Sequence, residues 1–334
     1  MQSFKLRLGM LGSVGLIIGI TTLGAALLLN GVLHLSFVWT LIFLIPLFFL
    51  QWYFAPRMVE YSMQVEPASP ERYPELHRTV EEISRDSQME KPEVMISRVE
   101  MPNAFAYGNI FSGHKVAVTD GLLGTLEQEE VEAVLAHEIG HLKHRDSEVM
   151  MFISILPALF MMLGRMLLWS SIFGGRRRNG APIILVAFGA MLFYFLLNLC
   201  ILWFSRLREY YADEFSANAI VDGPRKLQEG LAKINHAMAQ LKERKAQGQG
   251  FQSGRQRPEQ AGIGISPLGA GMKPLFISDP DVSQPLEGYS DRELVEKYKN
   301  QQTGLGAKFF ELFTTHPEIS KRLKALDNMR SGLT

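Results

Sequence analysis

The chain has 334 residues, and its 34 Lys plus Arg balance 34 Asp plus Glu, so its formal net charge is zero. A neutral chain lacks the basic surface that nucleic-acid binding requires, so we expect no nucleic-acid partner. The single cysteine, Cys200, excludes an intrachain disulfide and any multi-cysteine metal cluster, which leaves histidines and carboxylates as donors for a metal.

Residues 1–56 predict a membrane hairpin. No Asp, Glu, Lys or Arg occurs from residue 8 to residue 56, and the runs 8–30 and 35–54 are each long enough to span a bilayer. A signal peptide is the competing interpretation, but its apolar core would be shorter and no second span would follow at once.

Two further apolar runs, 149–171 and 181–204, predict a second hairpin. Arg165 in the first of them is costly near a bilayer centre unless it pairs or reaches the surface, so that segment could instead be partly immersed. The predicted organisation is a hairpin at 1–56, a soluble block at 57–148, a hairpin at 149–204 and a soluble block at 205–334.

The basic residues around the hairpins bear on which side of the membrane the soluble blocks occupy. Lys5, Arg7 and Arg57 flank the first hairpin and favour the cytoplasm for both blocks. Three arginines at 176–178 form the turn of the second hairpin and favour the cytoplasm as well. The turn of a spanning hairpin lies on the other side of the membrane from the soluble blocks, so the two groups of basic residues conflict. Hydropathy alone leaves this conflict open.

The soluble blocks show helical and strand patterns in turn. Ser69-Pro70-Glu71 predicts the start of a helix that runs to about residue 89. The other predicted elements, in chain order, are strands at 93–99 and 115–119, helices at 127–143 and 224–245, a mobile loop at 247–290 and helical segments within 291–329.

The predicted helix at 127–143 contains the string His137-Glu138-Ile139-Gly140-His141. One helical turn separates the two histidines, so both imidazoles project from one face and can share a zinc ion. Glu138 lies beside them, where it can take a proton from a water molecule at the metal. A surface helix that carries two histidines by chance is the alternative, and the well-capped apolar helix around the string argues against it.

A catalytic zinc usually has three protein ligands and a water, so a third ligand is needed. The helix that begins at Ser205 places Arg206, Glu209 and Asp213 on one face. Glu209 would complete the set, and Asp213 could accept a hydrogen bond from a ligand histidine and fix its orientation. An ordinary charged helix face is the alternative.

Four strings, AHEIGHLKHRD, SRLREYYAD, TTHPEISKRLKAL and MPNAFAYG, resemble the HtpX family of membrane zinc endopeptidases. CAAX prenyl proteases are more distantly similar. The resemblance implies an α-rich α+β membrane protein with about four transmembrane helices and a zincin-like catalytic domain that has a small sheet. It also implies one Zn²⁺ per chain, held by His137, His141 and Glu209, with Glu138 as the catalytic base.

The same resemblance supports two further site predictions. His316, which precedes Pro317, matches the family's His-Pro and could donate a hydrogen bond to the oxyanion of the transition state. A capping or structural histidine is the alternative. The second prediction is an edge strand that pairs with the substrate backbone, formed by Asn103, Ala104, Phe105 and Ala106. An ordinary loop with a buried Phe105 is the alternative.

The expected function is a multi-pass zinc endopeptidase of the cell (inner) membrane, with its active site on the cytoplasmic face. The resemblance implies a role in membrane protein quality control and stress response. Its expected partners are protein or peptide substrates, membrane proteins among them, and the lipid bilayer, while the oligomeric state stays open. One alternative is a CAAX-type prenyl-protein protease, for which four spans are few to enclose a chamber. The other is a non-proteolytic membrane chaperone with a structural zinc, against which an intact Glu138 and an open fourth ligand position argue.

Overall fold

A computed structural model describes residues 37–146, 149–150, single residues and pairs between 153 and 171, 180–246, 290–301, 311 and 313–332. The predicted span at 8–30, the arginine turn at 176–178 and the loop at 247–289 lie outside the described residues, as does most of the predicted span at 149–171. Contacts divide the chain into two compact units, residues 1–56 with 145–208 and residues 57–144 with 209–334.

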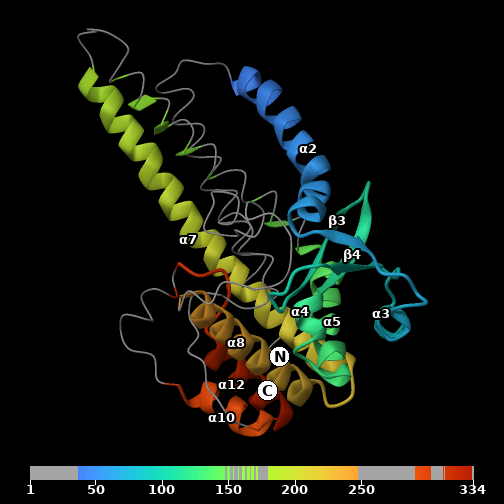
Figure 1. Ribbon diagram of the computed structural model, residues 1–334. Coiled ribbons are helices and arrows are strands. Elements are labelled where there is room, and N and C mark those ends of the chain that lie inside the picture. Colours follow the sequence, from blue (N-terminus) through green and yellow to red (C-terminus); the bar gives the residue numbers. More distant parts are fainter. Residues whose placement is uncertain are drawn as a thin grey trace. The chain divides into compact units, whose positions relative to one another are not determined.

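Two long helices carry the apolar runs that the structure describes, α2 (Phe37–Ser62) and α7 (Gly180–Ala219) (Figure 1). Among the described residues, one segment, Ile183–Ala219, has the length and hydropathy of a membrane span. Several of its large apolar side chains are exposed, with Leu185 at 74% and Phe188 at 59%. A helix in a water-soluble protein would bury such side chains in the core, so this exposed apolar surface fits contact with lipid.

The second unit contains a four-stranded sheet in the order β1-β2-β4-β3. Its strands are β1 (Val65–Pro67), β2 (Glu93–Ser97), β3 (Ala104–Asn109) and β4 (Gly113–Thr119). β2 pairs in parallel with β4, whereas the other two pairings are antiparallel. β3 therefore lies at an edge of the sheet that the structure describes, and a three-residue turn joins it to β4.

Helices pack around this sheet and around one another (Figure 1). They are α3 (Pro74–Asp86), α4 (Asp120–Leu123), α5 (Gln128–Lys143), α8 (Gly223–Ala246), α10 (Asp291–Asn300) and α12 (Ile319–Arg330). α5 packs against β3, α3 and α8, and α8 packs in turn against α10 and α12. Their shared core includes Val134, Leu231 and Leu323, all without exposed surface. The prediction of a helix-rich α+β protein with a small sheet is thus confirmed, while four membrane spans stay a prediction.

The start of α3 differs from the prediction. The helix begins at Pro74, and the backbone carbonyl of Ser69 instead closes a turn by accepting hydrogen bonds from Arg72 and Tyr73. A helix that started at Pro70 would place Pro74 where a backbone N–H must donate, which proline cannot do. The second proline therefore sets the boundary, because the first turn of a helix tolerates it.

Candidate active site

The start of α5 is fixed by a buried acid. The carboxylate of Glu130 accepts a hydrogen bond from the backbone N–H of Glu127 at 2.8 Å, and its other oxygen lies 2.6 Å from Nζ of Lys233 on α8. Acids in the first turn also favour the helix dipole. The helix start is thereby anchored to α8, and the second half of α5 carries His137, Glu138 and His141 into the core, at most 8% exposed.

The structure brings His137, His141 and Glu209 together as a group that could hold a metal ion. One donor atom from each lies within 4.8 Å of the others, and all three residues are buried. The two histidine Nε2 atoms are 3.2 Å apart, and the Glu209 carboxylate oxygens lie 3.6 Å from His137 Nε2 and 3.5 Å from His141 Nε2. Ligands about 2.1 Å from one tetrahedral ion are separated by about 3.4 Å, so the spacing fits zinc.

α7 can approach α5 this closely because residue 140 is a glycine. A Cβ atom at Gly140 would lie 2.9 Å from Cδ1 and 3.2 Å from Cβ of Phe215. Phe215 is six residues beyond Glu209 on α7, so the contact sets the distance between the helices near the third donor. The glycine of the His-Glu-x-x-His string therefore has a packing role that the string alone does not reveal.

Glu138 is buried and held by the edge strand. Its Oε2 accepts a hydrogen bond from the backbone N–H of Ala106 on β3 at 3.0 Å. Burial raises the pKa of the Glu138 carboxyl, with a further upward contribution from Glu209 that the two neighbouring histidines partly offset. Because a raised pKa makes a carboxylate a better proton acceptor, Glu138 is suited to act as a general base.

Asp213, one turn beyond Glu209 on α7, orients His137. Its Oδ1 lies 3.0 Å from Nδ1 of His137, on the opposite side of the ring from Nε2. Burial by itself lowers the pKa of His137, but hydrogen bonds to Asp213 and Glu209 outweigh burial and raise that pKa to about 9. This arrangement presents Nε2 toward Glu209 and His141.

Arg322 of α12 neutralises the two buried acids, a role that the sequence reasoning missed. Its Nε and Nη2 donate to Asp213 at 2.9 and 2.6 Å, and its Nη1 lies 3.3 Å from Oε2 of Glu209. The side chain is only 2% exposed. A signal was present, because residue 322 falls on the apolar helix face with Ile319 and Leu326, where a charged residue needs a buried partner.

His316 also reaches this group. It is 5% exposed, and its Nδ1 lies 3.1 Å from Oε2 of Glu209. Its Nε2 makes no hydrogen bond within the part of the chain that the structure describes. The structure thus places His316 at the candidate metal group, beside Glu209.

The predicted edge segment is a strand and not a loop, since Ala104, Phe105 and Ala106 belong to β3, and Asn103 precedes it. Phe105 is buried at 2% exposure, in a cluster with Met95 and Ala117. Among the residues that the structure describes, the other histidines and Arg206 lie outside the metal group. His144, for example, packs its ring against Tyr211 at 4.1 Å between centroids.

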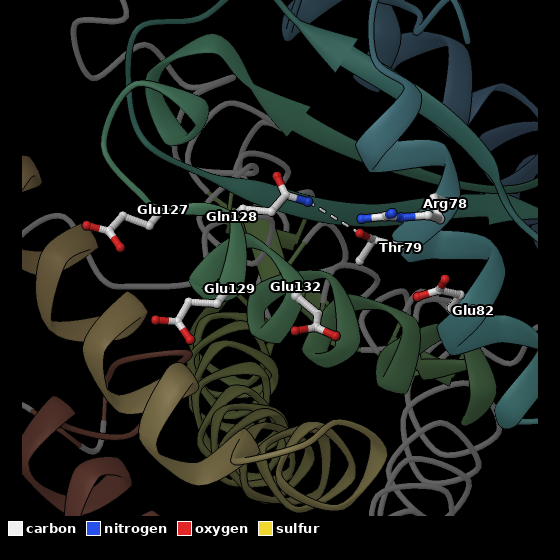
Figure 2. Close-up of a pocket in the computed structure, with 7 residues that line it drawn as sticks. All are labelled: Arg78, Thr79, Glu82, Glu127, Gln128, Glu129 and Glu132. Carbon is white, nitrogen blue, oxygen red and sulfur yellow. Dashed lines mark hydrogen bonds between the residues drawn. The ribbon is translucent and has the colours of Figure 1, made fainter.

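A surface pocket of about 400 Å³ lies at the other end of α5 (Figure 2). It is lined by Arg78, Thr79, Glu82, Glu127, Gln128, Glu129 and Glu132. Two of its acids already have cationic partners, since Glu129 lies 2.9 Å from Arg225 and Glu132 lies 2.6 Å from Lys226. The pocket is therefore a charged surface depression, distinct from the buried metal group.

Comparisons with known proteins bear on this geometry. The model of peptidase family M48 matches residues 70–330. A protease HtpX homolog from Thermoplasma acidophilum is 37% identical over 339 residues and covers 99% of both chains. A second homolog, from Aeropyrum pernix, is 39% identical over 289 residues, which cover 85% of this chain and 83% of that one.

The crystal structure of S. mikatae Ste24p is similar in fold, with a TM-score of 0.50 at 17% identity, over 94% of this chain and 66% of that one. The family match includes all of the candidate site residues, from the edge strand to His316. The family match and the HtpX homologs support a membrane-associated metalloprotease, and they do not favour the non-proteolytic chaperone or the prenyl-protein protease that the sequence left open. The chain belongs to peptidase family M48, and it is a membrane-associated metalloendopeptidase.

Proposed function

We propose that the protein is a zinc-dependent endopeptidase that binds one zinc ion through His137, His141 and Glu209 and uses Glu138 as its general base. The convergence of three buried donor atoms within 4.8 Å carries this proposal. The donors lie next to Glu138, a buried carboxylate whose pKa is raised. Two imidazoles and one carboxylate form a donor set that suits catalytic zinc and leaves a fourth position for water.

A bound zinc ion would act as a Lewis acid that polarises the scissile carbonyl and a water molecule. Glu138 takes one proton from that water as its oxygen attacks the carbonyl carbon, and it passes the proton to the amine nitrogen as the C–N bond breaks. The N–H of Ala106 keeps the carboxylate aimed during both transfers. The Nδ1 atom of His316 faces Glu209, which leaves Nε2 on the other side of the ring, and an N–H at Nε2 would donate to the developing oxyanion.

The substrate backbone would lie along β3. The N–H of Ala106 points away from β4, toward Glu138, so this side of β3 faces the candidate base. An extended peptide added to this edge would bring its scissile bond beside Glu138 through main-chain hydrogen bonds, which are largely independent of sequence. A protease that acts on misfolded or membrane proteins needs such broad recognition.

We further propose that α2 and α7 are two of about four membrane spans, so that the protein is multi-pass in the cell membrane. The unit that contains the candidate site, residues 57–144 with 209–334, is the catalytic unit. It then lies on the cytoplasmic face, as Lys5, Arg7 and Arg57 favour. The proposed substrates are membrane proteins and misfolded proteins, degraded in membrane protein quality control and in the stress response.

The test of the catalytic roles compares variants of the full chain purified in detergent. Glu138→Gln should keep one zinc per chain and lose nearly all hydrolysis of a denatured protein substrate, because it removes the base and leaves the donors. Glu132→Gln, on the same helix but outside the metal group, is the matched control and should retain activity. Retained activity in Glu138→Gln would contradict the mechanism.

The assignment of the third ligand is tested on α7. Glu209→Ala should lose zinc and activity, whereas Asp213→Ala should reduce zinc affinity or activity by about 10- to 100-fold, because Asp213 acts on the metal only through His137. Glu214 points elsewhere on the helix, so Glu214→Ala should change neither. Loss of zinc from Asp213→Ala but not from Glu209→Ala would reverse the assignment.

A further inference from the structure

The turn between β3 and β4 exposes two large apolar side chains. Ile110 is 67% exposed and Phe111 is 58% exposed. Met58 and Tyr61, near the C-terminal end of α2 in the same compact unit, are 57% and 90% exposed. Contact between water and large apolar side chains at a hairpin tip is unfavourable in free energy, so these side chains would gain from an apolar environment that covers them.

The backbone of this turn is satisfied from within. Oδ1 of Asn109 accepts hydrogen bonds from the N–H groups of Phe111 and Ser112, both at 2.9 Å, and the N–H of Asn109 donates to Oγ of Ser112 at 3.1 Å. Lipid offers no hydrogen bonds to backbone groups, so a turn that enters it must provide its own. This turn does so for three of its N–H groups while its apolar side chains point outward.

The hairpin is also fixed to the end of α2 in a definite direction. Ser97 on β2 pairs with Thr119 at the end of β4 that is farthest from the turn. Its Oγ donates to the backbone carbonyl of Met63 at 2.6 Å. Glu60, three residues earlier, instead contacts Lys115 at 2.9 Å and Tyr107 at 3.3 Å. Lys115 and Tyr107 are cross-strand partners nearer the turn. Going from Met63 back to Glu60 on α2 therefore corresponds to going toward the tip of the hairpin. The tip points in the N-terminal direction of α2, in which its charge-free part follows.

Two lengths compare how far the hairpin and the end of α2 extend from their shared contact at Glu60. From Glu60 back to Pro56, where the charge-free run ends, α2 rises about 6 Å. From Tyr107 to the turn at Ile110, the strand advances about 10 Å. The tip thus extends from this contact at least as far as Arg57, the residue of α2 in the same unit that borders its charge-free part. Trp52 and Tyr53 lie just inside that part, as aromatic residues at a membrane interface do.

We propose that the tip of the β3–β4 hairpin, Ile110 and Phe111, inserts into the headgroup–acyl boundary of the bilayer. The proposal rests on the proposed span in α2. It gives the edge strand β3 a second attachment to the membrane, besides the chain itself, next to the segment that would receive substrate. Burial of two apolar side chains to a depth of about 5–10 Å is typical of interfacial anchors.

The test uses the full chain in nanodiscs of phosphatidylcholine and phosphatidylglycerol. In a Cys200→Ser background, a single cysteine replaces Phe111, Leu50 or Val221 and carries a polarity-sensitive fluorophore. Leu50 is the positive control within α2, and Val221, 84% exposed on the catalytic unit, is the control for an exposed apolar residue. Lipids with a doxyl quencher near the headgroup should quench positions 50 and 111 several-fold more than position 221.

The outcomes separate the two proposals. Quenching at position 50 but not at 111 would overturn the hairpin anchor and leave the α2 span intact. Absence of quenching at both positions would overturn both. Fluorescence at 111 that responds to added unfolded protein and not to the quencher lipid would also overturn the anchor and assign the tip to substrate binding. A fluorophore at Ile110 should repeat the result at 111, and zinc content checks that each variant is folded.

Discussion

Replacement of Arg322 tests how the candidate metal group is held together. Arg322→Met keeps the volume of the side chain but leaves Asp213, which has no exposed surface, without the two charged hydrogen bonds of 2.9 and 2.6 Å. Loss of one partner from a buried ion pair costs about 3–5 kcal/mol, because the remaining charge is uncompensated. At about 2–4 °C per kcal/mol for a unit of this size, Tm should fall by about 6–20 °C.

Thermal unfolding of the detergent-purified protein, followed by circular dichroism and paired with zinc analysis, measures this loss. The matched control is Arg78→Met, because Arg78 pairs with Glu75 at the surface and both side chains are more than half exposed. Such pairs contribute about 0–1 kcal/mol. A double variant, Asp213→Asn with Arg322→Met, should be destabilised by less than the sum of the single changes, since it removes both charges. An Arg322→Met protein as stable as Arg78→Met would refute the reasoning.

Three further predictions concern the same group of residues. Gly140→Ala should destabilise the protein by about 1–3 kcal/mol and weaken zinc binding, because the added Cβ, 2.9 Å from Phe215, forces α5 and α7 apart; unchanged Tm and zinc affinity would contradict the packing argument. Zinc affinity, measured by chelator competition, should rise with pH up to about 9, because His137 holds a proton below its raised pKa and must lose it to bind metal. Asp213→Asn should move that limit to lower pH, and an unchanged profile would exclude His137 as the group responsible. Chelation should abolish proteolysis and added zinc should restore it, whereas activity that survives full metal removal would exclude a metal mechanism.

The sequence by itself determines the features that depend on local spacing. Charge-free runs of about 20 residues reflect the thickness of a bilayer, and α7 contains such a run at 181–204. The helix at 127–143 follows from its apolar period and acidic first turn, and α5 differs from it by one residue. Because the helical repeat places residues four apart on one face, His137 and His141, and likewise Glu209 and Asp213, could be paired from sequence alone.

Only the tertiary structure decides which of these faces meet, because burial depends on contacts between residues far apart in the chain. Asp213 and Arg322 are 109 residues apart, and no local rule pairs them. The hydrogen bond from Ala106 to Glu138 depends on the packing of β3 against α5, and a backbone donor has no sequence signature. The space at Gly140 is visible only once Phe215 lies against it. Spacing along the chain thus selects the donors, and long-range packing sets their distances, their charge balance and their pKa values.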